Sequence, residues 1–374
     1  MKLMLGILCG GRSGEHEVSL RSASGIYRAL DRERFEPLLV AIDKSGGWHV
    51  GKAEALLLDA HDPARIRIDP SAPEVVPLHT AAREGECVLV SPGDLSEQAA
   101  IEAFLPIIHG TDGEDGALQG MLQLWGLPYV GADVLGSAVG MDKDVMKRLL
   151  TQADLPVAPF EAFHSLAEAR AGFADLASRL GLPLFVKPAA LGSSVGVSRV
   201  KDRGDYFRAL ADAFSYGEKV VVEQEIEGRE VECSVLGSRY SETYPPKASR
   251  AGEIRPRHGF YSYAAKYLDH DGAELIVPAD LPPGVEERIQ QLSLRAFETL
   301  ECDGMARVDF FFADDGRILV NELNTLPGFT PISMYPKLWE ASGLSYTDLL
   351  TRLVELALER HRRRGALKRD YDMN

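Results

Sequence analysis

Several features that define other protein classes are scarce in this sequence. The chain has four cysteines with no Cys-x-x-Cys pair among them, so we expect no disulfide framework and no cysteine zinc site. No run approaches the roughly 18 apolar residues that a membrane-spanning helix requires. These absences predict a cytoplasmic chain with reduced thiols and no membrane span.

Basic residues are outnumbered by acidic ones. Lys and Arg total 41, Asp and Glu total 56, and the formal net charge is −15. Nucleic-acid binding generally needs a positive field, so we expect no nucleic-acid partner. A few local lysines, arginines and backbone amides can still hold a phosphate group. The HExxH motif of zinc enzymes and the Walker A motif are missing, so any phosphate must be bound in another way.

The first third of the sequence alternates between apolar strand patterns and helical spacing. With 374 residues, the chain is too long for one small core, so we expect two or three domains. Its residues are 45% hydrophobic and 26% charged. The alternation over 1–131 is typical of an open parallel α/β domain with ligands at the carboxyl ends of its strands. The region 52–86, rich in Pro, Asp and Arg, predicts a peripheral elaboration. The expected strands are 3–8, 37–42, 88–91 and 101–108, and the expected helices are 15–30 and 116–125.

Beyond residue 131, short strands and a Gly-Ser loop replace this alternation. We expect two mixed α+β lobes, one over 132–223 and one over 224–374. Residues 245–274 are polar and tyrosine-rich without a period, and a loop this long is usually a lid or substrate loop, with a disordered insertion as the alternative. The expected strands are 182–188, 197–200, 219–223 and 230–236, and the expected helices are 137–153, 284–301 and 346–363.

An apolar hairpin pattern near the C-terminus carries acidic side chains. Its strands, 308–312 and 318–323, are joined by a segment that contains Asp315-Gly316, a strong hairpin signal. If these two residues form the loop, Asp314 faces Arg317 in the first pair of the hairpin. The pairing of every residue farther from the turn follows from this register.

Counting outward from that loop places Asp309 directly opposite Glu322, and Glu322 shares a face with Asn324. Opposed carboxylates repel each other unless a positive group lies between them. Hard oxygen ligands of this kind suit Mg²⁺ when phosphate oxygens complete its shell. The alternative is a solvated sheet face with ordinary polar residues, which the surrounding Phe, Val and Leu residues disfavour.

Candidate phosphate ligands lie between the two lobes. Lys187 ends an apolar strand and Lys143 lies in the first turns of a helix, so both are placed to meet a phosphate. The loop 192–196 (GSSVG) offers backbone amides and hydroxyls, and Glu223 and Glu230 flank a segment where an acid could accept from a ribose hydroxyl. Each feature alone is also typical of a solvated side chain or a simple turn. Together with the hairpin, they predict nucleotide binding between two β-rich lobes.

Seven motifs, in order along nearly the whole chain, resemble those of the D-alanine–D-alanine ligase family in the ATP-grasp superfamily. They are GGRSGEHEVSLRSA (10–23), HGTDGEDGALQGMLQLWGLPYVG (109–131), MDK (141–143), VKPAALGSSVGVSRV (186–200), AAKY (264–267), RVDFF (307–311) and NELNTLPGFT (321–330). No single motif identifies the family, but the combination is highly specific. The resemblance implies an N-terminal open parallel α/β domain followed by two-lobed ATP-grasp α+β domains.

The resemblance implies ATP as the nucleotide, together with two Mg²⁺ or Mn²⁺ ions, and leaves a K⁺ requirement open. Glu225 stands where many relatives carry an aromatic residue, so stacking on adenine is left open at this position. The implied metal ligands are Asp309, Glu322 and Asn324. The implied ATP site comprises Lys143, Lys187, Glu223, Glu225, Ile226 and Glu230.

The resemblance also implies two D-alanine sites. Glu15 is similar to the acid that holds the ammonium of the first D-alanine, and Ser193 and Tyr267 resemble its partners in a network that closes the lid. His109 resembles a histidine close to the first substrate. Lys266 resembles a lysine that contacts the transferred phosphate.

The implied reaction joins two D-alanines through an acyl phosphate, giving ADP and phosphate, for peptidoglycan precursor synthesis. Arg307 and the Gly328 amide would stabilise the tetrahedral intermediate, and Ser333 would contact the second carboxylate. The family also implies a homodimer. The alternatives are a D-alanine–D-lactate ligase, which the AAKY pattern with Tyr267 disfavours, another ATP-grasp carboxylate–amine ligase, and a catalytically inactive nucleotide-binding regulator.

Overall fold

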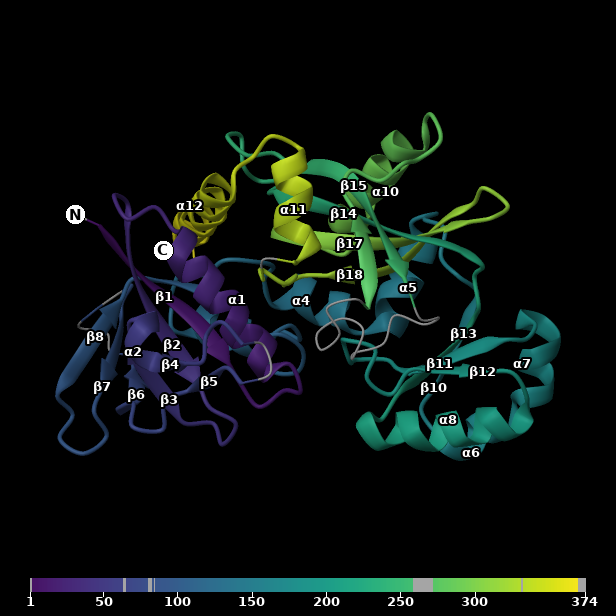
Figure 1. Ribbon diagram of the computed structural model, residues 1–374, viewed down its shortest axis with the longest axis horizontal. Coiled ribbons are helices and arrows are strands. Elements are labelled where there is room, and N and C mark those ends of the chain that lie inside the picture. Colours follow the sequence, from purple (N-terminus) through teal and green to yellow (C-terminus); the bar gives the residue numbers. More distant parts are fainter. Residues whose placement is uncertain are drawn as a thin grey trace, which may run out of the picture.

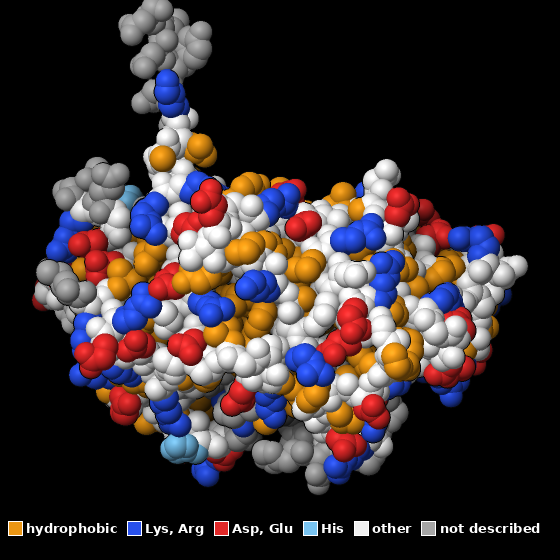
Figure 2. Space-filling view, turned by 90° about the horizontal axis from the view of Figure 1, so that it is seen from above, with side chains coloured by type: hydrophobic (Ala, Val, Ile, Leu, Met, Phe, Trp, Pro, Cys, Tyr) orange, Lys and Arg blue, Asp and Glu red, His pale blue; other side chains and the backbone are white. Residues whose placement is uncertain are grey.

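The computed structural model describes residues 2–62, 65–79, 83, 85–257, 272–330 and 332–368. These residues form three main sheets, flanked by helices, that follow one another along the chain (Figure 1). Acidic and basic side chains are interspersed with apolar ones over the face seen in Figure 2. Within the part of the chain that the structure describes, no helix is both long and apolar enough to cross a membrane.

The first sheet has seven strands in the order β8-β7-β6-β3-β2-β1-β9. β1 pairs in parallel with β2 and β9, as predicted, and the other pairs are antiparallel, so the sheet is mixed. The strands are β1 (Leu3–Gly10), β2 (Phe35–Ile42), β3 (Trp48–Gly51), β6 (Glu74–Leu78), β7 (Cys87–Val90), β8 (Glu97–Ile101) and β9 (Ala103–Pro106). Its helices are α1 (His16–Ala29), α2 (Ala53–Leu56) and α3 (Ala117–Leu124), and β4 (Leu57–Leu58) and β5 (Arg67–Ile68) form a small separate sheet.

Two expectations for this sheet are wrong. The region 52–86 is not entirely peripheral, because its strand β6 bridges β3 and β7 inside the sheet. The strand expected at 101–108 is instead the end of β8 followed by β9. The chain changes direction at Glu102, whose carboxylate accepts from Met4 N at 2.8 Å and whose own N–H donates to Met4 O at 3.0 Å.

The second sheet is antiparallel, with the strand order β10-β13-β11-β12. Apolar residues of its helices and strands form a core of their own, separate from those of the other sheets. The strands are β10 (Phe160–Phe163), β11 (Leu184–Pro188), β12 (Ser198–Val200) and β13 (Val220–Gln224). The helices are α6 (Leu166–Ala171), α7 (Phe173–Leu180) and α8 (Arg203–Tyr216).

The helix expected at 137–153 is two helices, α4 (Val134–Met141) and α5 (Lys143–Gln152). Asp142 leaves helical geometry, and its carboxylate accepts from Asp144 N and Val145 N, which caps α5. Met146 of α5 packs in the core of the third sheet. The domain boundaries 131/132 and 223/224 stay predictions.

The third sheet has the order β16-β15-β14-β17-β18 and is antiparallel. The strands are β14 (Gly228–Gly237), β15 (Lys247–Pro256), β16 (Ala273–Ile276), β17 (Gly304–Ala313) and β18 (Ile318–Asn324). The helices are α10 (Val285–Thr299), α11 (Met334–Ala341) and α12 (Tyr346–Gly365). Apolar side chains of α12 share one core with those of β1 and α1, so the last helix covers the first domain (Figure 1).

The loop expected at 245–274 is partly wrong, since β15 occupies residues 247–256 between β14 and β16. The polar composition of residues 247–256 is the reason that a loop was predicted there. Ser249 is fully buried and its hydroxyl accepts from Ser234 N, while the buried Glu253 is paired with Arg229 and Arg255. The rest of the expected lid, residues 258–271, lies outside the described residues.

Candidate active site

A cavity of about 1170 Å³ opens between the sheet of β11–β13 and the sheet of β14–β18, with one end of α1 at its edge. Residues far apart in the sequence meet here because elements around all three main sheets contribute to its wall. Predicted site residues that line it are Lys143, Lys187, Ser193, Glu223, Glu225, Ile226, Glu230, Arg307, Asp309, Glu322, Gly328 and Ser333. Lys266 and Tyr267 lie outside the described residues.

The β17–β18 hairpin opposes Asp309 and Glu322, which confirms the predicted pairing. The predicted two-residue loop and the Asp314–Arg317 pair are wrong, because Ala313 N donates to Arg317 O at 2.8 Å and encloses a three-residue loop. A β-bulge at Asn321 then adds one residue to β18 and restores the register.

The two carboxylates are not solvated side chains on an open face. The Asp309 side chain is 13% exposed and that of Glu322 is 25% exposed. Arg307 binds Asp309 through two nitrogens, each at 2.7 Å, and Lys143 Nζ lies 3.4 Å from Glu322 Oε2. Burial opposes the charge of Arg307, but the carboxylates of Asp309 and Glu232 raise its pKa well above the usual value. The site therefore already holds two positive side chains, Arg307 and Lys143, beside its carboxylates.

The side-chain oxygens of Asp309, Glu322 and Asn324 suit a divalent cation whose coordination shell is completed by phosphate oxygens. Asn324 Nδ2 donates to Asp309 Oδ2 at 3.0 Å, so one amide lies beside the opposed carboxylates. Among the described residues, no group of three or more His, Cys, Asp and Glu side chains is arranged to hold a metal ion. Because Mg²⁺ requires close to six oxygen ligands, these three side chains alone would leave its shell incomplete.

A buried charge cluster lies next to the phosphate-binding candidates. Glu223 is paired with Lys187, and its second oxygen lies 3.1 Å from Lys147 Nζ. Burial would raise the pKa of Glu223, but the two lysines hold it below its usual value, while burial lowers the pKa of Lys147. Lys147 was not among the predicted site residues, although it lies four residues after Lys143 and therefore on the same helix face.

At the other end of the cavity, Glu15, which is 8% exposed at the start of α1, does not itself line the wall but adjoins the lining residue Ser193. Ser193 Oγ donates to its carboxylate. Ser193 has a φ of +53°, and the neighbouring Ser194 has one of +60°, both in a backbone region that non-glycine residues rarely adopt. Such strain is common in loops that hold a ligand.

His109 does not line the cavity but lies behind this end of it. Its Nδ1 is 3.1 Å from Leu326 O, its Nε2 is 3.4 Å from Ser22 Oγ, and burial lowers its pKa. Glu114, which was also not among the predicted site residues, accepts from Gly110 N at 2.7 Å. Burial and the nearby charge of Glu15 raise the pKa of Glu114 to about 8.

The remaining predicted residues occupy two other parts of the wall. Glu225 binds Arg199 at 2.7 and 2.8 Å, and Ile226 and Glu230 line the cavity beyond it. Ser333 Oγ accepts from Thr330 N at 2.9 Å. A Cβ atom on Gly328 would lie 2.8 Å from that hydroxyl, so only glycine fits at this position without a shift.

The family models and a full-length relative agree on one family for this chain. Residues 4–132 match the family model described as D-ala D-ala ligase N-terminus, and residues 149–355 match D-ala D-ala ligase C-terminus. The chain is 51% identical to a D-alanine–D-alanine ligase of Shouchella clausii over 374 residues, covering 100% of both.

Two solved structures show the same fold. The D-alanine–D-alanine ligase of Coxiella burnetii superposes with a TM-score of 0.82 at 38% identity, covering 97% of this chain and 96% of that one. The VanG D-Ala:D-Ser ligase of Enterococcus faecalis superposes with a TM-score of 0.81 at 32% identity, covering 96% and 100%.

Proposed function

This chain belongs to the D-alanine–D-alanine ligase family, and from that membership we propose that it joins two D-alanines into D-alanyl-D-alanine with cleavage of ATP to ADP and phosphate. The observation that carries the proposal is a single cavity with two chemically different ends. One end has lysines and opposed carboxylates suited to a nucleoside triphosphate. At the other, the lining Ser193 donates to the adjoining carboxylate of Glu15, a pair suited to a small ammonium-bearing substrate.

At the nucleotide end, Lys143 and Lys187 bind the phosphates of ATP. Asp309, Glu322 and Asn324 hold divalent cations, Mg²⁺ or Mn²⁺, which when bound supply charge neutralisation at the phosphate oxygens. Glu223, Glu225, Ile226 and Glu230 contact the nucleoside.

At the amino-acid end, Glu15 binds the ammonium of the first D-alanine, and His109 supports that site from behind. A carboxylate oxygen of this D-alanine attacks the γ-phosphorus, the bond to ADP breaks, and an acyl phosphate forms. Lys266 and Tyr267, on the segment outside the described residues, have their proposed roles in contacting the transferred phosphate and closing the site. Excluding water matters because an acyl phosphate hydrolyses readily.

The amine of the second D-alanine then attacks the acyl carbon, and phosphate leaves with one former carboxylate oxygen. Arg307 and the Gly328 amide stabilise the oxyanion of the tetrahedral intermediate. Ser333 contacts the carboxylate of the second D-alanine. The product serves peptidoglycan precursor synthesis.

Phosphate release from Mg-ATP tests this proposal, with D-alanine, L-alanine and no amino acid compared. We expect release that requires D-alanine and yields the dipeptide. Adding D-lactate with limiting D-alanine distinguishes a depsipeptide-forming enzyme. ATP binding without D-alanine-dependent release would contradict the proposal.

We further propose that the protein acts in the cytoplasm, where ATP is available, and as a homodimer. Four free, buried cysteines are compatible with a reducing compartment. Light scattering after size-exclusion chromatography tests the dimer, and a monomeric mass at micromolar concentration would contradict it. Activity measured with K⁺ replaced by Na⁺ decides whether potassium is needed.

A further inference from the structure

Arg21 differs from the other basic residues that line the cavity. It lies on α1, is only partly exposed, and has no carboxylate partner among the described residues. The other basic residues of the wall each pair with an acid. The pairs are Lys143–Glu322, Lys187–Glu223, Arg199–Glu225, Arg229–Glu253, Arg255–Glu253 and Arg307–Asp309.

The surroundings of Arg21 also indicate that its charge lacks a compensating anion. Burial lowers the pKa of Arg21, and no neighbouring acid raises it again. A guanidinium that is partly removed from water without an anion is unfavourable, because it loses hydration and gains no ion pair. A ligand with an acidic group would supply the missing partner.

The position of Arg21 suits the far end of a dipeptide. Glu15 and Arg21 are six residues apart, which is a rise of about 9 Å along a helix. An extended dipeptide spans roughly 7 Å from its ammonium to its carboxylate. A zwitterion with its ammonium at Glu15 therefore brings its carboxylate within reach of the long Arg21 side chain.

The helix α1 packs against the segment proposed to hold the second substrate at the residue after Arg21 and again one turn later. Ser22 Oγ is 3.4 Å from Phe329 N, and a Cβ atom on Gly25 would lie 3.3 Å from Phe329 O. The residues that follow, Thr330 and Ser333, line the same cavity as Arg21.

We propose that Arg21 binds the carboxylate of the acceptor D-alanine, and hence the C-terminal carboxylate of the dipeptide product. The planar guanidinium can donate two parallel hydrogen bonds to a carboxylate, which selects for that group. Arg21 thus sets acceptor specificity for amino acids with a free carboxylate. This inference rests on the proposed function.

Calorimetric binding of D-alanyl-D-alanine and of its C-terminal amide, in the presence of Mg-ADP, tests the inference. Arg21→Gln should raise the Kd of the dipeptide at least roughly tenfold, because a charge-assisted hydrogen bond is lost. Its Kd for the amide should stay at the wild-type value. Arg28→Gln is the matched control, since Arg28 is an exposed arginine on the same helix, and it should change neither Kd.

Equal dipeptide affinity in Arg21→Gln and wild type would overturn the inference, and so would an equal loss for dipeptide and amide, which indicates a structural role. If Arg21→Gln does not fold, Arg21→Lys carries the test and must weaken the dipeptide more than the amide. A wild type that neither releases phosphate with D-alanine nor binds the dipeptide refutes the proposed function itself. A wild type that does both, with an unaffected Arg21→Gln, refutes only the role of Arg21.

Discussion

Glu223 is held between two ammonium groups in the interior, with Lys147 fully buried and Glu223 3% exposed. Each member of such a cluster is tolerated only because its partners compensate the loss of hydration. Lys187 is the member that the proposed function assigns to a phosphate. If Lys187 binds a phosphate as proposed, Lys147 remains 3.1 Å from Glu223 to neutralise it, which would make Lys147 a positioning residue.

Lys147→Met should therefore destabilise the fold by roughly 3 kcal/mol, because Glu223 loses one of its two buried partners. Urea unfolding measures this change. In the double variant Lys147→Met/Glu223→Gln, part of the lost stability should return, since the uncompensated charge is gone. Additive losses in the double variant would show that the two groups do not interact.

The raised pKa of Glu114 predicts that the stability of the fold depends on pH. Its pKa is raised from 4.5 to about 8, so between these values the folded protein keeps a proton that the unfolded chain releases. Stability from this group is fully present below pH 4.5 and is lost as the pH rises through 8. Glu114→Gln does not titrate, so its gain in unfolding free energy over wild type should grow from pH 5 to pH 8.

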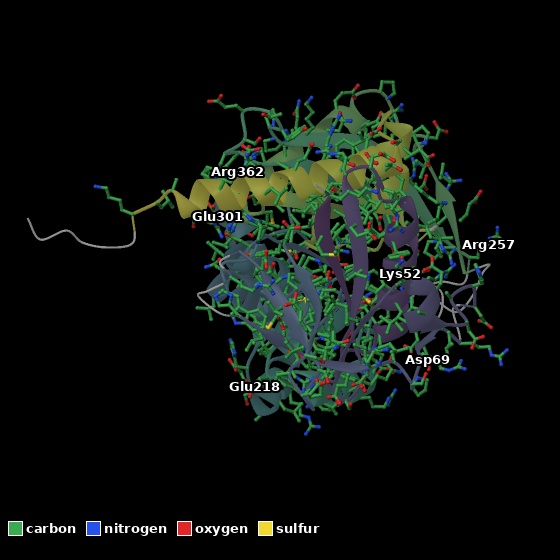
Figure 3. The ribbon with its side chains drawn as sticks, turned by 90° about the vertical axis from the view of Figure 1, so that its left-hand side faces the viewer. Lys52, Asp69, Glu218, Arg257, Glu301 and Arg362 are labelled. Carbon is green, nitrogen blue, oxygen red and sulfur yellow. The ribbon has the colours of Figure 1, made fainter. Side chains whose placement is uncertain are left out.

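Urea unfolding at pH 5, 6.5 and 8 measures the Glu114 effect. The matched control is Glu218→Gln, since Glu218 is exposed and far along the chain from this site (Figure 3). A difference between Glu114→Gln and wild type that is the same at all three pH values would contradict the assignment.

At the scale of single elements, the β17–β18 hairpin shows what sequence patterns can predict. Period-two alternation and the Asp-Gly signal located the hairpin, and the predicted pairing of Asp309 with Glu322 is correct. They were not enough to find the three-residue loop or the bulge at Asn321, which cancel each other in the register. A bulge depends on what the strand packs against, and that information is not local.

The turn of this hairpin gives a prediction that is independent of catalysis. Gly316 has a φ of +86°, and nothing lies within 4 Å of where its Cβ would be. Gly316→Ala should therefore cost about 1 kcal/mol from backbone strain alone, with activity unchanged. Gly365→Ala at the end of α12, which also has open space, should cause no loss. Thermal unfolding compares the two, and equal melting temperatures would remove the strain argument.

β15 shows the opposite limit of sequence patterns. Its composition suggested a loop, yet the chain forms an inner strand there because β14 and β16 satisfy its backbone on both sides. Buried polar groups such as Glu253 are stable only with partners from other strands. No local pattern predicts those partners.

At the scale of the whole molecule, α12 joins the end of the chain to its beginning. Arg360 is buried, and its guanidinium donates to Gly131 O and Tyr129 O at 2.6 Å each. The same group lies 4.5 Å from the centre of the Tyr129 ring. The sequence predicted the helix, but not this contact across 229 residues.

Arg360→Met should lower the unfolding free energy by about 3 kcal/mol, because two buried carbonyls lose their donors. Arg362→Gln is its control on the same helix, where Arg362 is exposed near the end of α12 (Figure 3), and should leave stability unchanged. Denaturation by urea compares both with wild type. Similar stability of Arg360→Met and wild type would show that α12 does not fasten the first domain.

In the proposed reaction, one cavity activates a carboxylate with ATP and then passes the acyl group to an amine. Transfer of ¹⁸O from carboxyl-labelled D-alanine to the released phosphate tests it most directly, because an acyl phosphate leaves one substrate oxygen on phosphorus. We predict one ¹⁸O in each phosphate formed with the dipeptide, and none when L-alanine replaces D-alanine. Dipeptide formation with unlabelled phosphate, or with the label recovered in AMP, would contradict the account.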